Sequence, residues 1–336
     1  MDTNASGEGK EVLWRARDHR KQRHMDYAPG SGKPSRRQSG WRKVANMRNI
    51  EYWNVSWWVA VLFTLGSVVW VINGFIVFLP FVTSVSKNPV SGGWSAWLGA
   101  TIFAFASLFL IPEAWNRSNT VAFGWGVEQV LRGRKPDIES KGNGHKSLVL
   151  EESNSPGPSN NHVNSESNPS RPARKWVWWT TDTKYWHELG FLAGFVQLCA
   201  ATIFWISGFS GLPEIQTAIE NNTPLLSGAY WTPQVIGGSG FMISSTLYML
   251  ETQTKWYKPN PADLGWQIGF WNFIGAVGFT LCGIFGYSLT SWRQYQSCLS
   301  TFWGGWAFLI GSTLQWYEAV NAVRPASSGW DDGEKS

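Results

Sequence analysis

Cysteine and histidine are scarce in this chain, and their spacing indicates neither cross-links nor a metal site. The three cysteines, Cys199, Cys282 and Cys298, are odd in number and lack CxxC spacing, so neither a disulfide framework nor a zinc site is expected. Of the five histidines, only His187 lies close to an apolar block. We interpret it as a polar interfacial residue rather than a metal ligand or proton carrier, and we expect no metal and no cofactor.

The sequence also lacks the residue sets of common enzyme classes. It shows no Ser/His/Asp set, no phosphate-binding glycine loop and no His/Asp pair of the acyltransferase kind. An enzyme acting on lipid would need a nucleophile or a metal set of this kind. We therefore expect that the protein is not an enzyme.

Lys and Arg are absent from six long apolar stretches, although the chain of 336 residues carries 28 of them. Each stretch has about 20 residues, the length of a helix that crosses the hydrocarbon core of a bilayer. Many of the 24 Trp residues lie at the ends of these stretches, where an indole ring can sit at the headgroup level. These features predict an all-α polytopic membrane protein with six transmembrane helices in three tandem helical hairpins, at 57–79, 94–111, 187–209, 234–250, 264–287 and 302–317.

Basic residues are rare between the two helices of each hairpin and abundant elsewhere. The three connections within hairpins carry Lys87, no basic residue and Arg293, whereas the segment before the first span holds 12 Lys or Arg against 6 Asp or Glu. Because positive charge resists translocation, both termini and the long loop are expected in the cytosol. No early apolar run predicts a cleavable signal peptide, so the first span is expected to direct insertion.

The resulting organisation has six parts. We predict a basic, mostly disordered cytosolic tail (1–56), hairpin 1 (57–116), a largely disordered cytosolic loop (117–184), hairpin 2 (185–257), hairpin 3 (258–321) and a cytosolic tail (322–336).

The predicted loop contains two kinds of sequence. Residues 143–174 are rich in Ser, Asn and Pro, so they bury too little apolar surface to offset the entropy of ordering. The stretch KWVWWTTDTKYW at 175–186 mixes basic and aromatic residues. Because it directly precedes a span, we interpret it as an interfacial segment on the bilayer and not as a nucleic-acid site.

Two positions are candidates for modification. Asn221 begins the sequon expected on the lumenal side, whereas the sequons at Asn4, Asn54 and Asn116 fall on the cytosolic side. Ser39 follows two arginines in RRQS, a spacing that basophilic kinases accept. A phosphate there would weaken attraction to anionic cytosolic-leaflet lipids; the alternative is a solvated basic tail without regulation.

The second helix of each hairpin carries one pattern, GxxxFxxxSxxxxxE. At 100° per residue its four positions form a stripe about 120° wide on a helix, which is suited to helix packing. The copies are Gly99/Phe103/Ser107/Glu113, Gly237/Phe241/Ser245/Glu251 and Gly304/Phe308/Ser312/Glu318.

The first helix of each hairpin matches more loosely, as a small residue, seven others, and then glycine followed by an aromatic residue. Small residues at such spacing allow helix backbones to approach closely in lipid. We infer three tandem copies of one two-helix unit. The matches are Gly66 with Gly74/Phe75, Ala200 with Gly208/Phe209 and Gly278 with Gly286/Tyr287, so the packing glycines are Gly66, Gly74, Gly99, Gly208, Gly237, Gly278, Gly286 and Gly304.

The stretches FTLGSVVWVINGFIVFLP (63–80) and WAFLIGSTLQWYEAVN (306–321) resemble the two helices of the small YrhK-like membrane domain. The six spans together resemble uncharacterised multi-span integral membrane proteins of filamentous fungi that carry such hairpins. Hairpin 2 departs from this pattern, since Ala200-Ala201 stands where hairpin 1 has Gly66-Ser67. The resemblance implies a membrane module without catalytic residues.

Glu113, Glu251 and Glu318 are the strongest candidates for a site, because each ends a span where the helix macrodipole disfavours negative charge. One interpretation is that each marks the water boundary and bonds locally. The other is that they converge on a cytosolic vestibule that binds a cation or a cationic headgroup. The possible partners are Asn116, Asn321, Arg117, Lys255 and Arg324.

Several amides within the spans allow the same two interpretations. Gln197, Gln267 and Asn272 could extend a vestibule, or they could be interhelical hydrogen-bonding groups, which is also our interpretation of Asn73 and Ser207.

Our preferred functional hypothesis is a non-enzymatic membrane scaffold that binds lipid or protein partners, or copies of itself, in the plasma membrane or an endomembrane. The alternative is a passive channel or uncoupled transporter whose cytosolic mouth is lined by Glu113, Glu251 and Glu318. No Asp, Lys or Arg lies in the central part of a span, which argues against ion-coupled transport.

Overall fold

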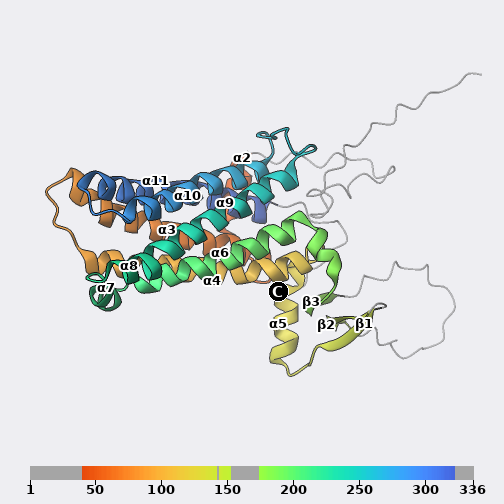
Figure 1. Ribbon diagram of the computed structural model, residues 1–336. Coiled ribbons are helices and arrows are strands. Elements are labelled where there is room, and N and C mark those ends of the chain that lie inside the picture. Colours follow the sequence, from red (N-terminus) through yellow and green to blue (C-terminus); the bar gives the residue numbers. More distant parts are fainter. Residues whose placement is uncertain (1–39, 142–143, 153–173, 322–336) are drawn as a thin grey trace, which may run out of the picture.

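The computed structural model describes residues 40–141, 144–152 and 174–321, and these residues are mostly helical. Six long helices run side by side along the molecule (Figure 1), and each overlaps one predicted span. They are α3 (Val55–Val82), α4 (Pro89–Trp115), α6 (Leu189–Ser210), α9 (Thr232–Thr252), α10 (Leu264–Gly286) and α11 (Ser291–Val320).

Four of these helices, α3, α4, α6 and α10, are long and apolar enough to cross a membrane, which fits an integral membrane protein. The helices α9 and α11 are not among them. Their sequences show why: α9 is rich in Gly, Ser and Thr, and α11 begins with the polar stretch SWRQYQS.

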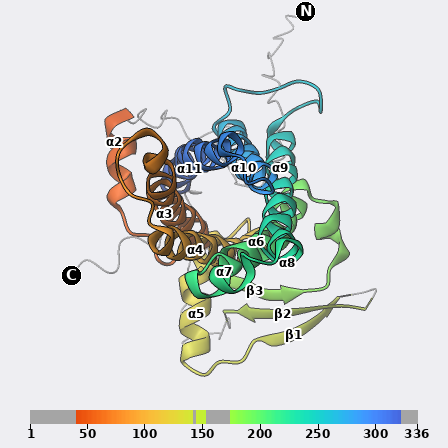
Figure 2. The same ribbon diagram turned by 60° about the vertical axis from the view of Figure 1, so that its left-hand side comes forward.

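The six long helices form a closed ring (Figure 2). Going around it, α3 contacts α4, then come α6, α9, α10 and α11, and α11 contacts α3 again. The seam between the last and the first of these helices includes a hydrogen bond of 3.3 Å from Ser312 Oγ to Ser67 Oγ, both of them buried. Residues 245 positions apart in the chain thus close the ring.

Glycines in the second halves of α3, α6 and α10 allow each of these helices to approach the helix before it in the ring. A Cβ atom at any of the three would lie 2.8 Å or less from that neighbour, so a larger residue would push the helices apart. Gly74 packs against Phe302 of α11, Gly208 against Ala100 of α4 and Gly283 against Val235 of α9.

The centre of the ring is filled by aromatic side chains, and each long helix contributes at least one. The ring centroids of Trp70 and Phe279 are 4.6 Å apart, and those of Phe204 and Phe279 are 5.6 Å apart. These rings therefore form a continuous core across the ring of helices. Six of these rings, one from each long helix, are Trp70, Phe204 and Phe279 from α3, α6 and α10, with Phe103, Phe241 and Phe308 from α4, α9 and α11, and Phe63 of α3 packs beside Phe103 in the same cluster.

One end of the ring, which we call the sheet end, carries a small domain that corrects the prediction of a largely disordered loop. It contains α5 (Phe123–Leu131) and an antiparallel sheet of strands β1 (Asp137–Lys141), β2 (His145–Glu151) and β3 (Lys175–Thr180), in the order β1-β2-β3. The predicted disorder is wrong for residues 144–152, because Val149 and Leu150 of β2 are buried. Residues 153–173 lie outside the described part.

The segment predicted to lie on the bilayer is instead partly a strand with a buried tryptophan. Trp176 of β3 is 0% exposed, and its ring lies 5.4 Å from that of Phe123. A Cβ atom at Gly126 of α5 would lie 2.9 Å from the Trp176 ring, so this glycine makes room for the indole. The aromatic residues at 176–178 are thus partly used to attach the sheet to α5 rather than to contact lipid.

Short helices complete both ends. At the sheet end, α2 (Gly40–Ala45) and η1 (Asn46–Arg48) lie against the end of α11, where Asn321 Nδ2 donates a hydrogen bond of 2.9 Å to the Lys43 carbonyl. η2 (Thr120–Ala122) precedes α5, and η3 (Thr183–His187) links β3 to α6. The opposite end carries α7 (Pro213–Ile219) and α8 (Thr223–Leu226), as Figure 1 shows, and η4 (Ser227–Trp231) directly follows α8.

Candidate functional site

Glu113 lies near the end of α4 and is bonded to the start of α3. Ser56 Oγ donates a hydrogen bond of 2.6 Å to Glu113 Oε1. Its expected partner Asn116 is directed elsewhere: Asn116 Nδ2 donates to the Val177 carbonyl and Asn116 Oδ1 accepts from the Val177 N–H, both at 2.8 Å. Asn116 thus fastens strand β3 to α4.

Glu251 ends α9 in a half-buried ion-pair cluster. Arg117 Nη1 lies 3.1 Å from Glu251 Oε1 and 3.6 Å from Glu188 Oε2, and the Glu251 side chain is 7% exposed. A Cβ atom at Gly190 would collide with the Arg117 guanidinium and the Glu251 carboxylate. The first turn of α6 therefore needs a glycine there so that Arg117 can connect α4 with α9.

Glu318 near the end of α11 is the most buried of the three, at 3% exposed. Its neighbour Asn321 binds the Lys43 carbonyl, and Asn46 Nδ2 donates to Asn321 Oδ1 at 2.9 Å. The three carboxylates lie on alternate helices of the ring, α4, α9 and α11. Glu113 bonds Ser56, whereas Glu251 pairs with Arg117. Lys255 lies in the turn after α9, and Arg324 lies outside the described residues.

The amides within the spans mostly connect neighbouring segments. Asn73 Nδ2 donates to the Gly92 carbonyl at 2.8 Å, which joins α3 to α4. Ser207 Oγ donates to Gln234 Oε1 at 3.4 Å, which joins α6 to α9. Gln267 Nε2 donates to the Pro261 carbonyl in the loop before α10. No such bond is described for Gln197 and Asn272. Gln197 is buried in α6. Asn272 of α10 packs against Gly311 of α11, where an added Cβ atom would lie 2.6 Å from Asn272 Oδ1.

All eight glycines predicted to mediate packing lie against a neighbouring segment. A Cβ atom at Gly66 would lie 2.5 Å from Phe103, one at Gly99 would lie 2.9 Å from Trp70 and one at Gly237 would lie 2.7 Å from Phe204. Those at Gly278 and Gly304 would meet the facing helix, α11 or α10, and that at Gly286 would meet Trp231. Gly74 and Gly208 are described above.

The pattern predicted for α10 is shifted by three residues: the prediction places its two small residues at Gly278 and Gly286, whereas the contacts assign these positions to Gly275 and Gly283. Gly275 faces Phe308 in the same way as Gly66 faces Phe103. A Cβ atom added at Gly275 would lie 2.7 Å from Phe308, and one added at Gly66 would lie 2.5 Å from Phe103. Gly283 then takes the place of Gly74 and Gly208. Both registers satisfy a spacing of eight residues between glycines. The aromatic residue after the second glycine favours the predicted register, since Tyr287 follows Gly286 whereas Ile284 follows Gly283, but the contacts support the other one.

A pocket of about 280 Å³ lies at the sheet end, between the end of α4, the end of β3 and the start of α6. It was not predicted from the sequence, because its walls come from three separate segments. Six of its lining residues are aromatic, with apolar Ile111 and Leu198 and polar Thr180 and Asp182 among the others. The aromatic residues are Trp115, Trp179, Tyr185, Trp186, Phe191 and Phe195.

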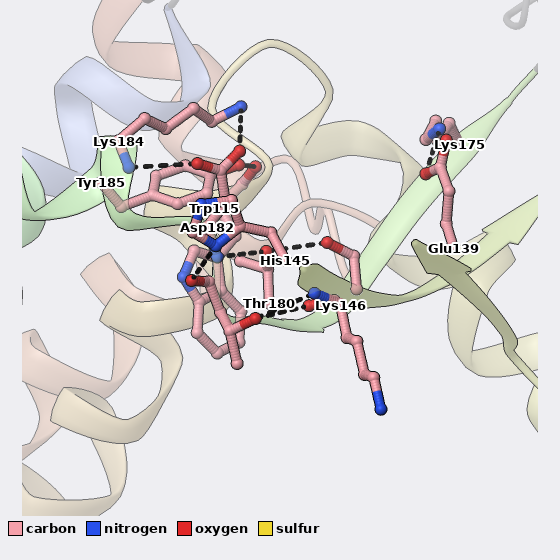
Figure 3. A network of polar contacts seen from close by, with 11 residues as sticks. Trp115, Glu139, His145, Lys146, Lys175, Thr180, Asp182, Lys184 and Tyr185 are labelled. Atoms are coloured by element: carbon pink, nitrogen blue, oxygen red, sulfur yellow. Dashed lines mark hydrogen bonds and ion pairs between the residues drawn. The ribbon is translucent and has the colours of Figure 1, made fainter. Parts of the chain in front are cut away.

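Charged groups lie at the polar side of this pocket. Lys184 Nζ lies 3.4 Å from Asp182 Oδ2 and 4.7 Å from the centroid of the Tyr185 ring, and Tyr185 donates a hydrogen bond of 3.3 Å to the Trp115 carbonyl. Figure 3 shows these residues together with Thr180. Burial alone would raise the pKa of Asp182, but the Lys184 N–H and ammonium outweigh it and hold that pKa below its ordinary value. Asp182 is therefore a carboxylate at neutral pH.

The remaining candidates are isolated. His187 is exposed at the end of η3, and in the described part of the chain no group of three or more His, Cys, Asp or Glu residues could hold a metal ion. The three cysteines are free. Asn221 is exposed in the turn before α8, whereas Asn54 and Asn116 are 5% and 4% exposed. Ser39 and Asn4 lie outside the described residues.

Comparisons with protein-family models, with curated proteins and with solved structures give no match for this chain. The resemblance to YrhK-like hairpins therefore depends on the two sequence stretches alone.

Proposed function

We propose that this protein is a non-enzymatic scaffold of a cellular membrane, with six transmembrane helices built as three copies of one two-helix unit. In this proposal α9 and α11 cross the membrane within the ring, although they are less apolar than the other four. Contacts with their neighbours support this, since Phe241 and Phe308 are 1% and 5% exposed and Ser245 and Ser312 are 3% and 2% exposed. Polar groups are tolerated in a span when other helices cover them.

The repeat is supported by equivalent contacts in the three units. In each unit a small residue and, four residues later, an aromatic residue of the first helix pack against the second helix of the same unit. Eight residues after the small residue, a glycine packs against the preceding unit. The three sets are Gly66/Trp70/Gly74, Ala200/Phe204/Gly208 and Gly275/Phe279/Gly283.

The observation that carries the scaffold proposal is the aromatic core. Six large side chains meet where a conducting path along the axis of the ring would run, and the bulky rings Phe241 and Phe279 are 1% and 2% exposed. A pore would need this core to separate. A ring packed in this way is a rigid frame whose outer surface and sheet end remain available to partners.

Flux measurements separate this proposal from the channel alternative. The purified full chain is reconstituted into proteoliposomes, and the release of K⁺, Cl⁻ and small neutral solutes is compared with that of empty vesicles. We expect no release above the empty vesicles. Release that is lost in Glu113→Gln, Glu251→Gln or Glu318→Gln, while the variant still folds, would overturn the scaffold proposal in favour of a channel with a carboxylate-lined mouth.

A further inference from the structure

The pocket between α4, β3 and α6 changes in character from one side to the other. Ile111, Phe195 and Leu198 form its apolar side, on the two helices, whereas Thr180 and Asp182 form its polar side, beside the sheet. Phe195 is 37% exposed on the outer surface of α6, which would face lipid if α6 spans a membrane. This gradient suits a ligand that is itself amphipathic, with one end in the hydrocarbon and the other at the headgroup level.

The aromatic rings of the pocket are closely spaced. Trp186 lies 5.3 Å from Phe191 and 5.0 Å from Phe195, and Tyr185 lies 5.9 Å from Phe191, between ring centroids. Aromatic faces attract a cation within about 6 Å, and clusters of such rings are the usual site for quaternary ammonium groups. Lys184 over the Tyr185 ring shows that a cation is already stabilised by an aromatic face at this rim.

The polar groups of the lining favour a quaternary over a primary ammonium group. A primary ammonium carries three N–H donors that each need an acceptor, but Asp182 is the one carboxylate among the lining residues and already accepts from the Lys184 N–H at 3.1 Å. A trimethylammonium group has no donor to satisfy. Lys184, at the rim, supplies the positive charge that a phosphate beside such a group would require.

We propose that this pocket binds the phosphocholine headgroup of a membrane phospholipid, with the trimethylammonium group among the aromatic rings and the phosphate toward Lys184. Its volume, about 280 Å³, is slightly below the range of pockets that enclose drug-sized ligands, about 300–1,000 Å³, so it fits a headgroup and leaves the acyl chains outside along α4 and α6. This proposal rests on the proposed membrane function and names the lipid that the scaffold would recognise.

The test uses the purified full chain in maltoside detergent with radiolabelled dioleoylphosphatidylcholine as the probe. We expect saturable binding of one lipid per chain. Unlabelled phosphatidylethanolamine and phosphatidylserine with the same acyl chains should displace it at concentrations at least about tenfold higher than unlabelled phosphatidylcholine requires. The double variant Trp179→Ala/Trp186→Ala should weaken binding about tenfold or more. Both tryptophans are about half exposed, at 45% and 48%, so their removal leaves the core intact.

Trp256→Ala is the matched control, since Trp256 is 80% exposed in the turn between α9 and α10 and lies outside the pocket. Equal binding of phosphatidylethanolamine, or unchanged binding in the double variant, would overturn the proposal. Displacement by glycerophosphocholine at the same concentration as the lipid would overturn the assignment to a membrane lipid and indicate a soluble choline compound. The two proposals fail in different experiments. If the pocket does not select phosphatidylcholine, the binding assay shows it while the proteoliposomes still release no ions. If the scaffold proposal is wrong, the proteoliposomes release ions or solutes.

Discussion

The rings of Trp70 and Phe279 lie face to edge with centroids 4.6 Å apart, although their helices, α3 and α10, are not neighbours around the ring. These two side chains therefore meet across the centre of the molecule. Together with Phe204, which lies 5.7 Å from Trp70, they connect the first helices of all three proposed units. A ring of helices without such a core would depend on neighbour contacts alone.

Trp70→Ala should destabilise the whole ring. Trp70 is 4% exposed, and removal of a large aromatic side chain from a packed core costs about 3–5 kcal/mol. Trp70→Phe should cost less, because it keeps an aromatic ring, and the indole N–H that it removes makes no hydrogen bond among the described residues. The check is the midpoint of unfolding by SDS in mixed micelles. A Trp70→Ala midpoint equal to that of the unsubstituted protein would show that the core does not support the ring.

Gly190→Ala should break the connection between α4 and α9. The new methyl group would occupy the space of the Arg117 guanidinium and the Glu251 carboxylate, so the pair must separate. Hydrogen bonds to charged groups contribute about 1.5–3 kcal/mol, and we expect a loss of that size in the free energy of unfolding. Gly92→Ala is the control, because its Cβ atom would lie at an ordinary 3.4 Å from Val77.

A double-mutant cycle then assigns the effect to the ion pair. If Arg117 and Glu251 act together, Gly190→Ala should add little to Arg117→Gln/Glu251→Gln. Full additivity would instead mean that Gly190 acts through the backbone of α6.

The contact between Asp182 and Lys184 should persist across the neutral range and fail at the extremes of pH. The pKa of Asp182 is lowered from its ordinary 3.8, so its stabilising contribution is present above that value and is lost as pH falls through the lowered pKa. Burial alone would lower the pKa of Lys184, but the negative charges that Tyr185 and Asp182 can carry outweigh it and raise that pKa above 10.5. The contribution of Lys184 is therefore present below 10.5 and lost as pH rises through the raised pKa.

Acid unfolding of the unsubstituted protein and of Asp182→Asn tests this expectation. The two should differ in stability at pH 7 and converge as the pH falls below the ordinary pKa of Asp182. A constant difference down to the lowest pH would show that the carboxylate charge makes no contribution.

Asn221 reports the orientation in the membrane. If the sheet end faces the cytosol, the exposed turn before α8 is lumenal, and Asn221 is the sequon that receives a glycan. Endoglycosidase treatment should then increase electrophoretic mobility, and Asn221→Gln should abolish this shift while Asn4→Gln leaves it unchanged. A shift that depends on Asn4 instead would place the amino terminus in the lumen and reverse the proposed orientation.

The positions of α3, α4, α6 and α10 could be predicted from the sequence because each is encoded locally, by a long apolar stretch. For α9 and α11, which are less apolar, the repeated GxxxFxxxSxxxxxE pattern gave the signal. The eight predicted glycines also lie in close contacts, since small residues at regular spacing are a direct signal of helix packing. The predicted register of α10 is wrong. Gly275/Gly283 and Gly278/Gly286 have the same spacing, and Tyr287 after Gly286 favours the second pair, whereas the partners Phe308 and Val235 support the first.

The sheet and the pocket depend on contacts between distant residues. Strand β2 is a short stretch within a polar segment, and it is stabilised by pairing with β3 across the intervening residues, as with Leu150 and Trp176. The pocket lies where β3 meets α4 and α6, and Asn116 fastens β3 to α4 there through two hydrogen bonds to Val177. Neither the pairing nor the attachment leaves a periodic signal in the sequence.

The most direct test of the closed ring is a disulfide across its seam. Ser67→Cys and Ser312→Cys are introduced together in a chain whose Cys199, Cys282 and Cys298 are replaced by Ser or Ala, and native membranes are oxidised. The hydroxyl oxygens of Ser67 and Ser312 lie 3.3 Å apart, and we predict efficient formation of an intramolecular disulfide. The positive control is Ser297→Cys with the native Cys282 retained, since Ser297 Oγ and Cys282 Sγ lie 3.3 Å apart between α11 and α10. A control pair that forms a disulfide while the seam pair does not would show that α3 and α11 are separated in the membrane, which contradicts the closed ring.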